Sequence, residues 1–307
     1  MLSRSQFVFK VIDVVMYNMQ NGISFQNIEC VKDVIYKPDG GIANSGNIYY
    51  DKNMAAAGRK FPVILNIHGG GFVMGDKDFR WSLSEFYAHN GYFVFNINHR
   101  LSPEAVFPEN CNDCVDALNY LSVLAQDYNI DLDKVIITGD SSGAYLATYV
   151  TAMAFDDELR EKIGGHEVKI KPAALASFCG IYDMDTVLHR PIPFGIMQDV
   201  ATQFMGMKVK RDMSNVYDFE FFDYLSPSGF VNEKWCPVFI VWSDEDLICV
   251  GQGDVMEKIL QEKCPNVGSY HCAGLMNNHC YHLTYRTKPA KKTMAAFLRF
   301  MKSIDLY

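Results

Sequence analysis

Five short apolar runs constrain the fold of this 307-residue chain more than any other feature. Their almost continuous apolar character is typical of strands buried on both faces, as in parallel sheets. Between and after them, segments such as 112–127 and 293–302 carry apolar residues at helical spacing. This alternation predicts an α/β fold with a mostly parallel central sheet flanked by helices. The five runs are residues 61–67, 92–97, 134–138, 173–178 and 237–242.

The composition indicates a folded protein that acts on a small molecule. Hydrophobic residues make up 49% of the chain and charged residues 21%, which excludes extensive disorder. With 28 Lys and Arg against 36 Asp and Glu, the net charge is −8, and no basic stripe is present. We therefore expect a small neutral or cationic substrate, with neither nucleic acid nor a membrane surface as partner. A homodimer is left open.

The sequence predicts neither membrane insertion nor export. No stretch of about 18 apolar residues occurs, so we expect no membrane-spanning helix. The apolar stretch 7–16 is interrupted by Lys10 and Asp13 and lacks a small-residue cleavage site, which is not typical of a signal peptide. The nine cysteines are an odd number scattered along the chain. They favour free thiols in a reducing, cytoplasmic setting.

Two segments do not fit the alternation of strands and helices. Residues 1–21 read as an isolated helix that ends at Asn21-Gly22. Residues 185–223 form a long insertion rich in Phe, Met and Pro. Long insertions in compact domains are often lids or binding elements. We therefore expect one α/β domain over 1–307, in which segments 1–21 and 185–223 form a helical cap over a pocket.

The strongest chemical signal is the sequence Gly139-Asp140-Ser141-Ser142-Gly143, which directly follows the run 134–138 and directly precedes a helical pattern. A serine on such a tight strand-to-helix turn is presented above the sheet, and glycines are needed where a Cβ would collide with a neighbouring element. The following helix N-terminus offers free N–H groups to a developing oxyanion. Ser141 is therefore the predicted nucleophile.

A second signal is the run His68-Gly69-Gly70-Gly71 at the end of another predicted strand. Three glycines in a row cost backbone entropy, so they mark a place where the backbone approaches something closely. A phosphate-binding loop is the alternative, but the flanking spacing does not match one. A loop of this type supplies oxyanion-hole N–H groups in lipases and esterases. We expect the hole at Gly70, Gly71 and Ser142, and His68 only as a support for the loop.

Together these motifs carry a family resemblance. In order and spacing, the chain from about Asn47 to its end resembles the hormone-sensitive-lipase-like esterases of the α/β-hydrolase fold. The chain departs from that pattern in three places: Asn98-His99 stands where Asp-Tyr is usual, Ser142 where Ala is usual, and Ala144 where a further Gly is usual. None of these departures touches a catalytic role. The motifs that carry the resemblance are His68 to Phe72, Arg100 to Glu104 with Phe107-Pro108 and Asp113, and Gly139 to Gly143.

In this fold the acid and then the histidine follow the serine along the chain. Asp244, Glu245 and Asp246 follow the last apolar run. The resemblance places the acid at Asp246, with Asp244 as the alternative. The sequence His279-Cys280-Tyr281 resembles the family's His-x-aromatic motif, which favours His279 as the base and leaves His282 as the alternative.

A zinc site is a competing interpretation of this C-terminal region. The spacing from Cys272 to His279 is wider than structural zinc pairs use, so zinc is the weaker interpretation. We expect neither a metal nor an organic cofactor. The residues that a zinc site would use are His271, Cys272, His279, Cys280 and His282.

The resemblance implies a serine carboxylesterase that acts on small esters through a Ser141-His279-Asp246 triad and an acyl-enzyme. The expected cap favours short acyl groups of the acetyl type. An amidase or peptidase with the same triad is one alternative. A non-catalytic small-molecule receptor on the same fold is another, although such receptors usually lose the histidine.

Overall fold

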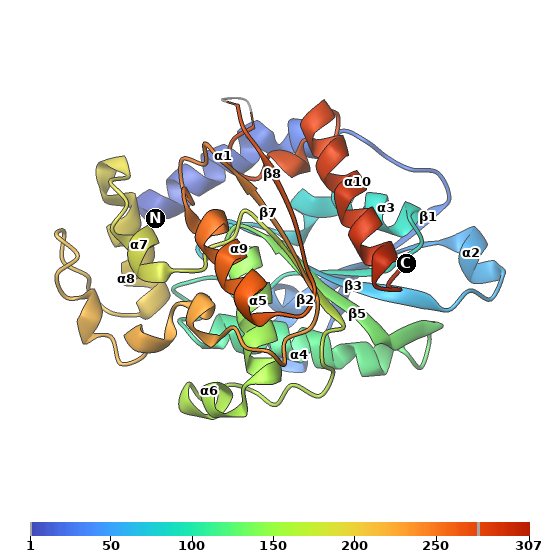
Figure 1. Ribbon diagram of the computed structural model, residues 1–307, viewed down its shortest axis with the longest axis horizontal. Coiled ribbons are helices and arrows are strands. Elements are labelled where there is room, and N and C mark those ends of the chain that lie inside the picture. The colour runs from blue at the N-terminus through green and yellow to red at the C-terminus, as the bar shows by residue number, and fades with distance from the viewer. Residues whose placement is uncertain (1, 275–276) are drawn as a thin grey trace.

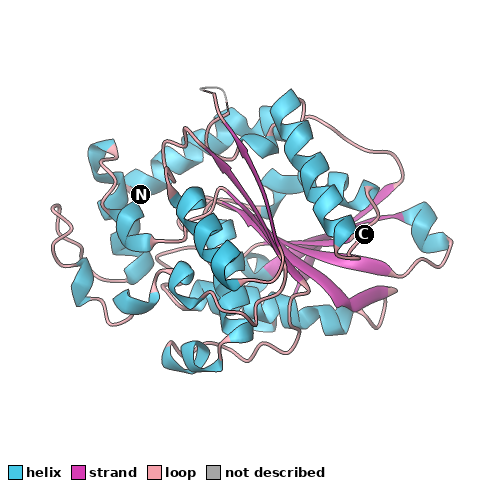
Figure 2. Cartoon of the chain, in the orientation of Figure 1, coloured by secondary structure: helices cyan, strands magenta, loops and turns pink. Residues whose placement is uncertain are grey.

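The computed structural model describes residues 2–274 and 277–307. Within these residues, eight strands form a single twisted sheet, and helices cover both of its faces (Figure 1, Figure 2). Along the sheet the strand order is β1-β2-β4-β3-β5-β6-β7-β8. The strands are β1 (Ile28–Ile35), β2 (Ser45–Asp51), β3 (Phe61–Ile67), β4 (Phe93–Ile97), β5 (Ile130–Asp140), β6 (Ala174–Phe178), β7 (Val238–Ser243) and β8 (Val267–Cys272).

Ten α-helices are assigned within the described residues. In chain order they are α1 (Arg4–Gln20), α2 (Lys52–Ala56), α3 (Trp81–His89), α4 (Glu109–Leu124), α5 (Ser142–Phe155), α6 (Asp157–Lys162), α7 (Met184–Leu188), α8 (Ile196–Met205), α9 (Gln252–Lys263) and α10 (Lys288–Ser303).

The pairing confirms the predicted mostly parallel sheet. Strands β4, β3, β5, β6, β7 and β8 run parallel to one another, whereas β2 is antiparallel to both β1 and β4. Leu65 at the centre pairs with Phe95 on one side and Ile137 on the other. The five apolar runs of the sequence correspond to β3 through β7. Because parallel strands end at a common edge, the loops that follow them gather at one side of the molecule.

Two apolar layers hold the sheet between the helices. Side chains of α4, α5 and α9 pack on one face, against residues that include Leu65 and Ile137. Side chains of α3 and α10 pack on the other, against residues that include Ile64 and Val94. Burial on both faces is the reason these central strands are almost wholly apolar.

The two segments that did not fit the alternation lie together. Helix α1 begins with a capping box between Ser3 and Gln6, in which the Ser3 hydroxyl accepts from the Gln6 amide and the Gln6 side chain accepts from the Ser3 amide. It packs along α8 of the insertion, where Asp199 accepts hydrogen bonds from the backbone and hydroxyl of Ser5 at 2.8 and 2.7 Å (Figure 1). None of the helices in the described part is both long and apolar enough to cross a membrane.

Candidate active site

Ser141 stands at the turn between β5 and α5, where the sequence places it. Its backbone lies at φ 55° and ψ −120°, a strained region for a residue with a Cβ. Its amide donates to the Phe178 carbonyl at 2.9 Å, which fixes the turn to the neighbouring strand β6. A Cβ at Gly139 would collide with the backbone of Gly143, and one at Gly143 with the Ile67 carbonyl. The glycines are therefore needed for this close approach.

His279 joins Ser141 to Asp246. Its Nε2 lies 2.8 Å from Ser141 Oγ, and its Nδ1 lies 2.7 Å from Asp246 Oδ2. The other carboxylate oxygen of Asp246 accepts from the amides of Ile248 and Cys249 at 2.8 and 2.7 Å. These two amides hold the carboxylate in one orientation, with the imidazole in hydrogen-bonding contact.

The charge states of Asp246 and His279 depend on each other. Burial alone would raise the pKa of Asp246, but the charge and hydrogen bond of His279, with the two amides, hold that pKa below its usual value. Burial alone would lower the pKa of His279, but Asp246 raises it well above its usual value. An imidazolium at His279 is therefore stabilised by its partner.

The alternative acid and base lie elsewhere. Asp244 Oδ1 is 2.8 Å from Nδ1 of the exposed His271, not from His279. His282 is only 1% exposed and stacks on Phe178 with ring centroids 4.4 Å apart. Within residues 2–274 and 277–307, neither of its ring nitrogens has a hydrogen-bond partner. The structure thus brings Ser141, His279 and Asp246 together and leaves Asp244 and His282 out.

The predicted oxyanion residues surround the serine. Gly70 and Gly71 line the pockets that contain Ser141 and have positive φ angles of 138° and 62°. Ser142 is the first residue of α5, so its N–H has no carbonyl partner within the helix. His68 Nδ1 lies 2.9 Å from the Gly69 carbonyl and thus supports the loop. Burial lowers the pKa of His68 to about 3, which keeps its ring neutral.

Two cavities flank Ser141, and they differ in polarity. The larger, of about 250 Å³, is open and is lined by polar and apolar groups from α1 and from the loops that carry the triad. The smaller, of about 30 Å³, is apolar and lies under α7 and α8. Phe9 of α1 lines both cavities. The smaller one is lined by Phe9, Gly71, Phe72, Ser141, Ile181, Met184, Val187, Leu188, Met197, Val200, Ala201, Phe204 and Ile248.

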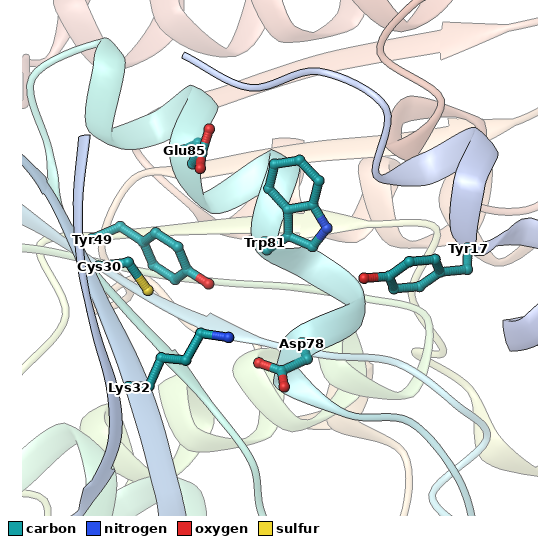
Figure 3. Close-up of a pocket in the computed structure, with 7 residues that line it drawn as sticks. All are labelled: Tyr17, Cys30, Lys32, Tyr49, Asp78, Trp81 and Glu85. Carbon is teal, nitrogen blue, oxygen red and sulfur yellow. The ribbon is translucent and has the colours of Figure 1, made fainter. Parts of the chain in front are cut away.

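A third cavity, of about 330 Å³, is lined by a different set of residues (Figure 3). The hydroxyls of Tyr17 and Tyr49, the Lys32 amine and the Asp78 carboxylate point into a common space beside Trp81 (Figure 3). It contains neither Ser141 nor His279. Size alone therefore does not select the candidate active site; the hydrogen-bonded serine and histidine do.

Comparison with known proteins agrees with this architecture. The BD-FAE family model matches residues 47–260, most of the chain. The chain belongs to the BD-FAE family. Among curated relatives, the esterase LipQ of Mycobacterium tuberculosis is 26% identical over 271 residues, which cover 87% of this chain. The same alignment spans 61% of LipQ's length.

Solved structures of esterases share the fold of this BD-FAE family member. Esterase B from Lactobacillus rhamnosis superposes with a TM-score of 0.81 at 18% identity, over 98% of this chain and 96% of its own. An esterase from the archaeon Pyrobaculum calidifontis gives 0.73 at 17% identity, over 99% and 93%. The α/β-hydrolase fold is thereby confirmed. Together with the family match and the LipQ relative, the comparisons also confirm the resemblance to hormone-sensitive-lipase-like esterases.

One buried ion pair in this BD-FAE family member was not predicted from the sequence. Arg80 Nε and Nη2 each donate to a carboxylate oxygen of Asp140 at 2.7 Å, and both side chains are buried. Burial would raise the pKa of Asp140, but Arg80 holds it below its usual value. Asp140 stands inside the serine motif, which was the available signal; nothing in the sequence marks Arg80 as its partner.

The zinc interpretation does not match the structure. His271 stacks on Trp242 and pairs with Asp244, while Cys280 Sγ lies 3.9 Å from Asp140. These residues are not brought around one point. In the described part of the chain, the group with ligand atoms close enough to share a metal is Asp246, Cys249 and His279, within 4.8 Å of one another. In this group, His279 Nδ1 and Asp246 Oδ2 already form a hydrogen bond with each other.

Proposed function

We propose that this protein is a serine carboxylesterase that hydrolyses small esters with short acyl groups through an acyl-enzyme. The observation that carries the proposal is the continuous hydrogen-bonded chain from Asp246 through His279 to Ser141, at the floor of a pocket flanked by Gly70 and Gly71. Membership of the BD-FAE family and the esterase relatives support it. The nine free cysteines fit a reducing, cytoplasmic setting.

The chemistry follows from the hydrogen bonds. With its Nδ1 proton donated to Asp246, His279 has a free lone pair on Nε2, which accepts the Ser141 proton as Oγ attacks the ester carbonyl. The tetrahedral intermediate collapses when His279 returns that proton to the leaving alcohol. Water then attacks the acyl-enzyme, again losing a proton to His279, and releases the acid and free Ser141.

The oxyanion of each intermediate needs donors that are already in place. The N–H groups of Gly70, Gly71 and Ser142 would supply them from the loop after β3 and from the start of α5. Removal of one such donor typically costs about 2.7–4 kcal/mol of transition-state stabilisation. The loop after β3 can approach the turn that carries Ser141 because residue 69 is a glycine. A Cβ at Gly69 would collide with the carbonyl and the carboxylate of Asp140.

The acid assignment can be tested by replacing each aspartate. We expect Asp246→Asn to lower kcat by about 10⁴-fold, because the amide favours the wrong tautomer of the histidine. Its remaining pH profile should shift to lower pH, because the carboxylate that raises the pKa of His279 is gone. Asp244→Asn is the matched control and should stay within about threefold of wild type, less than 1 kcal/mol. Steady-state kinetics across pH would reverse the assignment if Asp244→Asn were the damaging change.

The two cavities at Ser141 suggest where each half of an ester lies. An acyl chain is apolar and would enter the small apolar cavity under α7 and α8, whereas the alcohol would occupy the larger open one. A cavity of about 30 Å³ has room for very few carbon atoms. Esterase B, which shares this fold, has been solved with a tributyrin phosphonate inhibitor, whose acyl chains are also short.

This geometry predicts a steep dependence on acyl length. Hydrolysis of p-nitrophenyl esters should be fastest from acetate to butyrate and should fall on longer chains. Leu188 lines the small cavity, so Leu188→Ala should open it by about two methylene groups. At about 0.8 kcal/mol per methylene, the hexanoate-to-acetate rate ratio should rise by roughly tenfold.

The control for cavity size is Val123→Ala, on an exposed site of α4, which should leave the ratio unchanged. Wild-type rates that keep rising beyond octanoate would contradict the short-chain preference. Absence of hydrolysis across the whole series would contradict the proposed function itself.

A further inference from the structure

An unpartnered carboxylate faces the candidate active site from helix α1. Asp13 lines the same cavity as Ser141 and His279, and its side chain is partly buried there. Within the described residues its carboxylate makes no hydrogen bond; the neighbours that influence it act through charge alone. A partly buried carboxylate without a partner is unfavourable, and its cost is offset when a ligand supplies a donor or a cation.

The Arg80 guanidinium lines the same cavity as Asp13 but already has hydrogen-bond partners. The Arg80 guanidinium makes two charge-assisted hydrogen bonds to Asp140, and its Nη1 donates to the Phe79 carbonyl at 3.1 Å. The Arg80–Asp140 pair therefore carries no net charge. Asp13 is left as the uncompensated charge on this wall of the cavity.

The polarity of the two cavities decides which half of the substrate meets Asp13. The small cavity under α7 and α8 is lined by apolar side chains and the serine. The larger one contains Asp13, together with the amides of Gln20 and Asn278. The alcohol half of the ester, which leaves from Ser141 on the open side, is therefore the half beside Asp13.

We propose that Asp13 is a specificity-determining residue that favours esters whose alcohol half carries a positively charged nitrogen. This inference rests on the proposed esterase function. The attraction is Coulombic, so it acts on a cationic alcohol group, is absent for a neutral group of the same shape, and reverses for an anionic one.

The charge of Asp13 changes within an accessible pH range. Burial raises its pKa to about 6; Arg80 lowers it, while Asp140 and Asp76 raise it. His279 and Cys280 are the remaining titratable groups on the cavity wall. Asp13 is ionised above about pH 6 and neutral below it, so the preference for a cation should be present at pH 8 and should fade as the pH drops through 6.

The test compares two acetate esters of one shape: the ester of choline, which is cationic, and 3,3-dimethylbutyl acetate, its neutral carbon analogue. The quantity measured is the ratio of their kcat/KM values on one enzyme preparation. Because both esters use the same triad, the titration of His279 cancels in this ratio. In wild type we expect the cationic ester to be preferred by about tenfold at pH 8, as for close charge pairs in a partly screened site.

Three variants separate a charge effect from a structural one. Asp13→Asn should bring the ratio close to one, and Asp13→Glu should retain most of the preference. Glu161→Gln removes the same charge from exposed α6, which lies at the opposite edge of the molecule from α1 (Figure 1), and should leave the ratio unchanged. In wild type, a ratio that falls between pH 8 and pH 5 supports the proposal without any mutation.

Several results would overturn this inference. A wild-type ratio within twofold of one at pH 8 would show that no cation is favoured. An Asp13→Asn ratio equal to that of wild type, or a ratio independent of pH, would place the origin of the preference elsewhere. All of these outcomes require measurable hydrolysis of both esters, so they remain distinct from a failure of the proposed function, in which neither ester is cleaved.

Discussion

Ser141→Ala should abolish ester hydrolysis while leaving the fold intact. Without Oγ no acyl-enzyme can form, and loss of a serine nucleophile typically lowers kcat by about 10⁶-fold, leaving what the oxyanion donors and binding provide. The hydroxyl is not needed for folding, because among residues 2–274 and 277–307 its one hydrogen-bond partner is His279. The Ser141 backbone, with its amide bonded to Phe178, is unchanged by the substitution.

The measurement combines kinetics with covalent labelling. A fluorophosphonate should label wild-type protein on the peptide that contains Ser141, and peptide mass mapping should find no label on the variant. Ser122→Ala, on an exposed site of α4, is the matched control and should retain activity and labelling. Residual activity of Ser141→Ala within about tenfold of wild type, only about 1.4 kcal/mol, would show that another residue is the nucleophile.

The central strands could be predicted from the sequence because a strand that is buried on both faces needs apolar residues at almost every position. Strands β3, β4, β6 and β7, and β5 from Val135 onward, are buried on both faces, so each is an almost continuous apolar run. At the sheet edges this rule weakens. Strands β1 and β8 mix exposed and half-buried residues, and β2 is buried but has the polar sequence Ser45–Asp51. These three strands carry no apolar run, and only their pairing identifies them.

The residues of the candidate site likewise fall into those that a local sequence pattern predicts and those that it does not. Ser141 and the Gly70-Gly71 loop could be named because their backbone geometry demands glycines in a fixed local pattern. The choice of Asp246 over Asp244 depends on its contact with His279 across 33 residues, and the choice of His279 over His282 on its contact with Ser141 across 138 residues. Such long-range contacts leave no local signature.

Asp13 is the residue of the candidate site that the sequence could least predict. In the sequence it interrupts an apolar stretch and argues only against a signal peptide. In the fold α1 lies beside the cavity that contains Ser141, so the same carboxylate becomes a wall of the candidate site. Local sequence patterns predict that residues 1–21 form a helix. The position of α1 over the sheet is determined by its packing against α8.

The second large effect is expected at His279. Its replacement by Ala should lower kcat by about 10⁴- to 10⁶-fold, because no other base lies within hydrogen-bonding distance of Ser141 Oγ in the described part of the chain. Added imidazole should restore part of the activity, since the truncation leaves a space of that shape between Ser141 and Asp246. Rescue of this kind indicates a missing base and would not follow from misfolding.

His282→Ala is the discriminating partner of that experiment. The His282 ring is buried against Phe178 and does not contact Ser141, so its loss should lower the free energy of unfolding by roughly 2–5 kcal/mol, as for other large buried side chains. The folded fraction should keep kcat within about tenfold of wild type, since the reacting groups are untouched. Urea unfolding and kinetics on the same preparations separate the two effects. If His282→Ala were the inactive variant and His279→Ala the unstable but active one, the base would be His282. The hydrogen bond that Ser141 donates to His279 would then have no catalytic role.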